Sequence, residues 1–248
     1  MEPVYRSIEI VAAGAARAVG TRITYQGSEN IPRHGGAVIA MNHISYLDYL
    51  PDGLASRRRR RRVRYLIKQE ALHVGIVAWI INRTRCIPVD RRAGAAAYAE
   101  AVNRLRAGEL VGVFPEATIS RSFELKEFKS GAARMALEAQ VPIVPMIIWG
   151  AHRMWTKDHP KCLGRRQIPI TVRVGRPLNP VGTAVEVDTA LRRAMTRDLY
   201  AVQEQYPHPA GAYWVPARLG GGAPTPEEAR RRDEAELADR ARRHAGRS

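Results

Sequence analysis

The chain has 248 residues, of which 40 are Lys or Arg and 24 are Asp or Glu, so its formal net charge is +16 at pH 7. A composition of 45% hydrophobic and 26% charged residues is typical of a globular protein and excludes a wholly disordered chain. The longest stretches without a charge, such as residues 71–82, are shorter than the roughly 18 apolar residues of a membrane-spanning helix, so no transmembrane helix is expected.

The first twenty residues predict an amphipathic helix. Val4, Ile8, Val11 and Ala15 form a weak apolar stripe, which suits either packing on the protein or contact with a membrane surface. The segment lacks the basic start of a signal peptide, so no secretion is expected.

Extended and helical patterns alternate along the rest of the chain. Strands are predicted at 21–27, 35–42, 63–68, 85–90, 109–116, 141–150 and 168–175, and helices at 72–84, 93–109, 130–140 and 185–206. This alternation predicts a single α/β domain with a central, mostly parallel or mixed sheet flanked by helices. The expected division is an N-terminal helix at 1–20, the domain at 21–214, and a Gly/Pro linker with a charged, solvated helix or flexible tail at 215–248.

The positive charge lies in the body of the chain. From residue 217 onward there are eight arginines and six carboxylates, whereas Arg57 to Arg62 and Arg64 give seven arginines in eight positions. Such a cluster is expected to stay unburied. Three interpretations stay open: a solvated loop with no specific partner, a loop that binds an anionic membrane surface, and a loop that binds a nucleic acid. No nucleic-acid-binding motif accompanies the run.

His43 and Asp48 are candidates for proton transfer. On one continuous helix they would lie about 140° apart around the axis, but a helix that begins at Ser45 leaves His43 in the preceding turn, where Asp48 can reach it. A carboxylate bonded to one imidazole nitrogen fixes the tautomer, so that the other nitrogen can take a proton from a hydroxyl.

A second loop carries Glu116 and Arg121 directly after an apolar run. A carboxylate can bind substrate hydroxyls, and a guanidinium can bind a phosphate through two hydrogen bonds. The structural alternative is that Glu116 caps a following helix and Arg121 lies at the surface.

Five segments together resemble the sequence blocks of the PlsC-like glycerolipid acyltransferases. They are NHISYLD at 42–48, GIVAWIINRTRCIPVDR at 75–91, FPEATIS at 114–120, FKSGAARMA at 128–136 and VPIVP at 141–145. The order and spacing of these blocks are far more specific than any one of them. The whole sequence looks similar to the actinobacterial type of 1-acylglycerol-3-phosphate acyltransferase, and the preference for Arg over Lys strengthens this resemblance.

The resemblance implies roles for individual residues. His43 would deprotonate the acceptor hydroxyl for direct attack on an acyl thioester, without a covalent acyl-enzyme, and Asp48 would orient His43. Arg91 would lie at the phosphate, and Glu116 would position the acceptor. The other substrate-binding residues implied are Asn42, Ser45, Phe114, Pro115, Thr118, Arg121 and Lys129.

Two positions depart from the usual Phe-Pro-Glu-Gly-Thr-Arg-Ser block of this family. Ala117 replaces the glycine, and Ile119 replaces the arginine that would contact phosphate. Arg121 is the candidate substitute, and the alternative is an acceptor whose head group is not a simple phosphomonoester.

The function implied is acyl transfer from acyl-CoA or acyl carrier protein to 1-acylglycerol-3-phosphate, giving phosphatidic acid in phospholipid biosynthesis. No metal and no cofactor besides the acyl donor are expected. The expected location is the cytoplasmic face of the membrane, as a peripheral protein on an anionic lipid surface, with nucleic acid disfavoured as a partner. The alternatives are acylation of another lysolipid or glycolipid, and a non-catalytic basic module that binds anionic lipid or nucleic acid.

Overall fold

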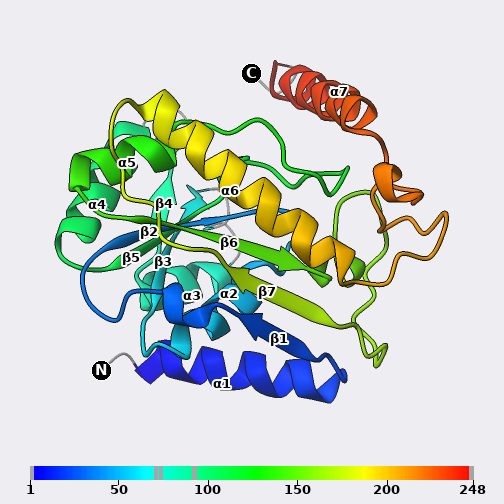
Figure 1. The fold of residues 1–248 in the computed structure, drawn as a ribbon, viewed down its shortest axis with the longest axis horizontal. Coiled ribbons are helices and arrows are strands. Elements are labelled where there is room, and N and C mark those ends of the chain that lie inside the picture. The colour runs from blue at the N-terminus through cyan, green and yellow to red at the C-terminus, as the bar shows by residue number, and fades with distance from the viewer. Residues whose placement is uncertain (1–2, 70–71, 73–74, 91–93, 246–248) are drawn as a thin grey trace.

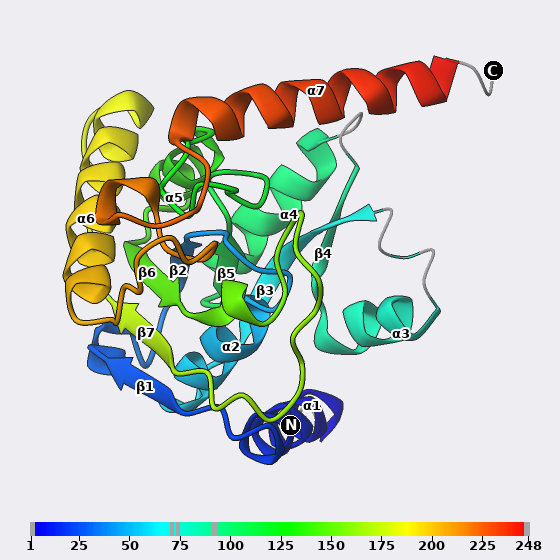
Figure 2. The same cartoon turned by 90° about the vertical axis from the view of Figure 1, so that its right-hand side faces the viewer.

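A seven-stranded sheet forms the centre of the molecule, with helices on both of its faces (Figure 1 and Figure 2). The structure is a computed structural model that describes residues 3–69, 72, 75–90 and 94–245. The strands are β1 (Ile23–Gln26), β2 (Ala37–Met41), β3 (Val63–Lys68), β4 (Ile87–Val89), β5 (Leu110–Val113), β6 (Ile143–Trp149) and β7 (Ile170–Val174). The helices are α1 (Pro3–Ala18), α2 (Tyr49–Arg57), α3 (Gly75–Thr84), α4 (Gly94–Arg106), α5 (Gly131–Ala139), α6 (Ala184–Glu204) and α7 (Pro226–Ala245).

The sheet is mostly parallel. Its strand order is β1-β7-β6-β2-β5-β3-β4, and the β6–β7 pair is antiparallel whereas the other neighbouring pairs are parallel. The predicted α/β fold with a mostly parallel or mixed sheet is therefore confirmed. Parallel neighbours require crossover connections, which the helices between the strands supply.

The sheet separates two hydrophobic cores. Along β2, Val38 and Ala40 face the core covered by α4, α5 and α6, whereas Ala37, Ile39 and Met41 face the core on the side of α2. Because both faces of the strand are covered, all five of its residues are buried. A continuous apolar run is the pattern that such a strand requires.

Helix α1 forms an outer layer against α2 and α3. The hydroxyl of its Tyr5 donates a hydrogen bond to the backbone carbonyl of Val63, 3.1 Å away, at the start of β3. Within the described residues, no helix combines the length and the apolar character needed to cross a bilayer.

Several arginines of the 57–64 run form contacts that stabilise the fold. Arg61 donates to the backbone carbonyls of Pro32, Gly35 and Gly108 over 2.7–2.8 Å. Arg64 lies only 5% exposed in β3 and contacts Glu109 at 3.3 Å, so the expectation that the whole cluster stays unburied is wrong at this position. An arginine can be buried here because the carboxylate of Glu109 and the backbone carbonyl of Thr84 accept hydrogen bonds from its guanidinium.

Helix α7 lies within the segment 215–248, for which a linker and a solvated helix or tail were predicted. A capping interaction lies at the N-terminal end of α7: the side chain of Glu228 accepts a hydrogen bond from the backbone N–H of Thr225 at 2.9 Å. The helix runs along the top of the molecule in Figure 2, above α5 and the neighbouring loops.

Replacement of Arg64 by Ala should lower the free energy of unfolding by about 1–3 kcal/mol, because the carbonyl of Thr84 loses a buried donor and Glu109 loses one of its cations. Glu109 keeps its contacts with Arg85 and Arg104, which limits the loss. Urea denaturation of the purified variant measures it. Arg33→Ala, the same change at an exposed site, is the control, and equal losses in the two variants would contradict a structural role for Arg64.

Candidate active site

Three loops meet at one edge of the sheet. They follow β6, β2 and β5, which are adjacent and parallel, so their carboxyl ends lie together. A cavity of about 1720 Å³ opens at this edge, and His43 from the loop after β2 and Glu116 from the loop after β5 both line it. Sites form at this place in open α/β sheets because the loops, and not the strands, supply the variable side chains.

His43 and Asp48 are in direct contact. The imidazole Nδ1 lies 3.0 Å from Asp48 Oδ2. The same carboxylate oxygen accepts hydrogen bonds from the backbone N–H groups of Ile44 at 2.9 Å and Ser45 at 2.8 Å. With Nδ1 directed at a carboxylate, Nε2 is the ring nitrogen left to accept a proton. The ring of Phe114 stacks on His43 with the ring centroids 4.0 Å apart, which fixes the plane of the imidazole.

The backbone around His43 and Asp48 differs from the predicted one. Helix α2 begins at Tyr49, not at Ser45, and residues before it form a turn. Asp48 occupies the N-terminal end of the helix, and its fully buried carboxylate points back to the turn. Burial raises the pKa of Asp48, while the hydrogen bond from His43 opposes this shift.

Glu116 connects the loops after β2 and β5. Its Oε1 accepts a hydrogen bond from the backbone N–H of His43 at 2.9 Å, and its Oε2 accepts one from the backbone N–H of Lys126 at 3.0 Å. The side chain is 4% exposed, and burial raises its pKa to about 7 in spite of these two donors. Glu116 therefore fixes the backbone position of His43 and still borders the cavity.

Asn42 and Ser45 direct their polar atoms to the protein. The amide of Asn42 donates to the carbonyl of Ile148 at 3.0 Å and accepts from the N–H of the same residue at 2.7 Å. The hydroxyl of Ser45 lies 2.7 Å from the carbonyl of Trp155 and 3.1 Å from that of Ala151. Neither residue lines the cavity, whereas Phe114, Pro115, Thr118 and Lys129 do.

The two departures from the usual family block have distinct structural consequences. Ala117 has a φ of 59°, in the left-handed region that glycine adopts without cost. Ile119 is 3% exposed, and its apolar side chain offers no donor to a phosphate.

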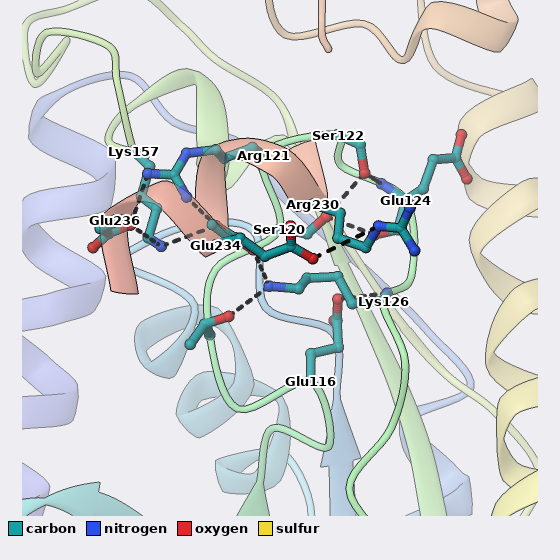
Figure 3. Close-up of polar contacts among 12 residues, drawn as sticks. Glu116, Ser120, Arg121, Ser122, Glu124, Lys126, Lys157, Arg230, Glu234 and Glu236 are labelled. Atoms are coloured by element: carbon teal, nitrogen blue, oxygen red, sulfur yellow. Dashed lines mark hydrogen bonds and ion pairs between the residues drawn. The ribbon is translucent and has the colours of Figure 1, made fainter. Parts of the chain in front are cut away.

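Arg121 lies near the cavity but does not line it, because carboxylates of α7 cover it (Figure 3). Arg91 lies outside the described residues. Sequence patterns did not single out Lys126 and Lys157, which line the cavity beside Thr118, nor the α7 carboxylates that contact them. The charge of the tail was the only sequence signal for these contacts, and it does not specify a partner.

Among the residues that the structure describes, no group of three or more His, Cys, Asp or Glu side chains is arranged to hold a metal ion. The polar groups of the site are a His–Asp pair, a buried carboxyl and a set of cations. This combination can activate a hydroxyl and bind an anion.

The raised pKa of Glu116 predicts how stability depends on pH. A carboxyl with an ordinary pKa of 4.5 and a folded pKa of about 7 favours folding below pH 4.5, and this contribution is lost as the pH rises through about 7. Glu116→Gln should therefore reduce the decline in unfolding free energy between pH 4.5 and 8, as measured by urea denaturation. Asp52, with a pKa also raised to about 7 by burial, maintains part of the decline. The exposed Glu29→Gln should keep the wild-type slope, and a wild-type slope in Glu116→Gln would contradict the shift.

Comparison with known proteins places this chain in a family. The sequence profile of the Acyltransferase family matches residues 22–149. A 1-acyl-sn-glycerol-3-phosphate acyltransferase from Limnanthes douglasii is 31% identical over 192 residues, which cover 73% of this chain and 63% of that protein. One from Borreliella burgdorferi is 30% identical over 142 residues, which cover 56% of each chain. The matched region thus spans less than two thirds of the length of these relatives.

A solved structure shares the fold. The crystal structure of the 1-acyl-sn-glycerophosphate (LPA) acyltransferase PlsC from Thermotoga maritima matches with a TM-score of 0.69 and 22% identity, over 82% of this chain and 81% of that chain. The family profile covers more than half of this chain, and His43, Asp48 and Glu116 all lie within it. The chain therefore belongs to the acyltransferase family of PlsC and the 1-acyl-sn-glycerol-3-phosphate acyltransferases.

Proposed function

We propose that this acyltransferase moves a fatty acyl group from acyl-CoA or acyl carrier protein to the free hydroxyl of 1-acylglycerol-3-phosphate. The product would be phosphatidic acid, so the reaction would belong to phospholipid biosynthesis. The observation that carries the proposal is the 3.0 Å contact between His43 Nδ1 and Asp48 Oδ2 at a large, mostly apolar cavity. The names of the Limnanthes and Borreliella relatives support the same acceptor.

His43 acts as the general base in this mechanism. Its Nε2 takes the proton of the acceptor hydroxyl as the oxygen attacks the thioester carbonyl carbon, and the buried Asp48 carboxylate stabilises the imidazolium that forms. The tetrahedral intermediate then collapses, the C–S bond breaks, and the thiolate receives the proton from His43. The products are an ester and a free thiol.

The apolar part of the cavity suits the acyl chains of donor and acceptor. Its walls include Ile8 of α1, Leu54 of α2, Leu66 of β3, Ile81 of α3 and Met135 of α5. Ile80, beside Ile81 in α3, also lines the cavity. Burial of each methylene group in such a cavity contributes roughly 0.8 kcal/mol to binding.

A different lysolipid or glycolipid remains the second candidate acceptor, and the buried Ile119 favours it. The family arginine expected at this position would bind a terminal phosphate. Acceptance of 1-acylglycerol-3-phosphate thus requires that other cations of the site take over this contact.

His43→Ala should lower the rate of acceptor-dependent thiol release from acyl-CoA by about 10²–10⁴-fold, because the variant has no general base. The fold should be retained, since the backbone N–H of residue 43 can still donate to Glu116. Release of CoA thiol, followed with a chromogenic disulfide, measures the rate with and without lysophosphatidate. His34→Ala, at an exposed position in the loop before β2, is the matched control.

A wild-type rate in His43→Ala would contradict the role of His43 as the general base. Thiol release that does not depend on any acceptor would identify a hydrolase instead. Monoacylglycerol and other lysolipids, tested beside lysophosphatidate, separate the two candidate acceptors. A preference for an acceptor that lacks the terminal phosphate would identify that acceptor, and not lysophosphatidate, as the substrate.

We also propose that the rim of the cavity rests on an anionic membrane at the cytoplasmic face. Tyr46 and Leu50 line the cavity, and 45% and 41% of their surface is exposed. In the adjoining helix α1, Ile10 is 53% exposed and Val11 is 69% exposed. These apolar side chains provide the weak insertion that a peripheral protein needs beside electrostatic attraction.

Val11→Asp should reduce retention on vesicles of mixed zwitterionic and anionic lipid, because it places a charge on the exposed face of α1. Cosedimentation at two salt concentrations measures this retention. Val181→Asp, at a position 77% exposed that does not border the cavity, introduces the same charge as a control. Equal retention of the two variants would argue against α1 as the contact surface.

A further inference from the structure

Three cations gather beside the candidate active site. Arg121 and Lys126 come from the loop after β5, and Lys157 comes from the loop after β6. Lys126 Nζ donates to Thr118 Oγ1 at 2.6 Å, so the cluster adjoins the residue that follows Ala117 in the family block. Arg121, Lys126 and Lys157 thus form a cationic cluster.

Two carboxylates of α7 bind all three members of the cationic cluster (Figure 3). Asp233 contacts Arg121 and Lys126, and its Oδ1 lies 3.6 Å from Lys157 Nζ. Glu236 Oε2 lies 2.8 Å from Arg121 and 3.0 Å from Lys157. These partners are far apart in the sequence, so the contacts depend on where α7 docks.

The charges indicate what else the cationic cluster can bind. Outside α7, the described carboxylate that forms an ion pair with the cationic cluster is that of Asp158, whose Oδ2 lies 2.6 Å from Arg121 Nε. Without Asp233 and Glu236, the three cations together with Asp158 would keep a net charge of +2. A phosphate monoester carries about −1.5 to −2 charge at pH 7 and offers several acceptor oxygens, so it can replace the two carboxylates in both charge and hydrogen bonding.

The cavity leads to these carboxylates. Lys126, Lys157, Asp233 and Glu236 line the same cavity as His43, whereas Arg121 lies behind α7 and does not line it. An acceptor whose hydroxyl lies at His43 can therefore extend its phosphate toward the cationic cluster, where it meets the α7 carboxylates first.

Helix α7 is held to the protein mainly by polar contacts. Of its described side chains, Ala229 is buried, whereas α6 buries eight residues along its length. Leu237 is 57% exposed. Because little apolar surface would be uncovered, displacement of α7 costs chiefly the ion pairs, and a competing anion can supply these.

We propose that Asp233 and Glu236 occupy the site in which Arg121, Lys126 and Lys157 bind the phosphate of the acceptor, so that α7 competes with the acceptor and moves away when it binds. The inference rests on the proposed function for the identity of the acceptor. It assigns the phosphate contact that Ile119 cannot make, and it makes α7 an internal inhibitor whose contacts imitate those of the substrate.

The test compares two double variants of equal charge. Asp233→Asn with Glu236→Gln removes both carboxylates from the cationic cluster at nearly constant size. Glu227→Gln with Asp239→Asn makes the same changes at positions of α7 where the ion-pair partners belong to α7 itself. Binding of sn-glycerol 3-phosphate, with glycerol as the phosphate-free control, is measured by titration calorimetry without an acyl donor.

The first variant should bind sn-glycerol 3-phosphate at least about 5-fold more tightly than the second, and its KM for lysophosphatidate should fall by a similar factor. Equal dissociation constants in the two variants would overturn the proposal. Tighter binding of the phosphate in a protein that acylates no lysophosphatidate would support the anion site and refute the proposed acceptor instead.

A measurement on the unmodified protein covers the case in which the first variant does not fold. Saturating sn-glycerol 3-phosphate should speed amide hydrogen exchange in α7 while leaving exchange in α6 unchanged, because α7 is released and α6 stays packed on the sheet. Unchanged exchange in α7 at saturation would contradict the displacement.

Discussion

The carboxylate of Asp48 organises the loop on which the whole site depends. One of its oxygens accepts hydrogen bonds from the imidazole of His43 and from two consecutive backbone N–H groups. A buried charge is costly unless donors surround it, so the loop must keep these donors directed inward. The carbonyl of His43 then accepts a hydrogen bond from the N–H of Ser120, and its N–H donates to Glu116. The loop after β5 is thus positioned by the loop after β2.

The parallel arrangement of β6, β2 and β5 explains why one cavity has two chemical characters. The loop after β2 supplies the His–Asp pair, and the loops after β5 and β6 supply the cations. The apolar walls come from helices on the α2 side and from α5 across the sheet. A lipid substrate has the same division, with apolar chains, a reactive hydroxyl and an anionic head group. The proposed acceptor would therefore match the site along its length.

Local patterns predicted the fold and the His43–Asp48 contact well, because apolar periodicity and a short turn depend on neighbouring residues. The start of α2 at Tyr49 was not predicted, since the preference of Ser45 for a helix cap was outweighed by its bonds to the carbonyls of Ala151 and Trp155. The burial of Arg64 depends on Glu109, 45 residues away, and the Lys126–Asp233 contact joins residues 107 apart. Contacts at such separations leave no periodic signal in a single sequence.

Arg61 shows that basic residues can stabilise the fold of a protein as well as bind its ligands. Its guanidinium joins the loop before β2, through the carbonyls of Pro32 and Gly35, to the turn before β5, through that of Gly108. A planar guanidinium presents five donors in a fixed fork, whereas a lysine ammonium is a compact charge on a flexible stem. Exchange of this arginine for lysine would keep the isoelectric point of the protein and lose the connection between the two loops. For this chain, the number of basic residues is a poorer guide to its ligands than the backbone carbonyls that those residues reach.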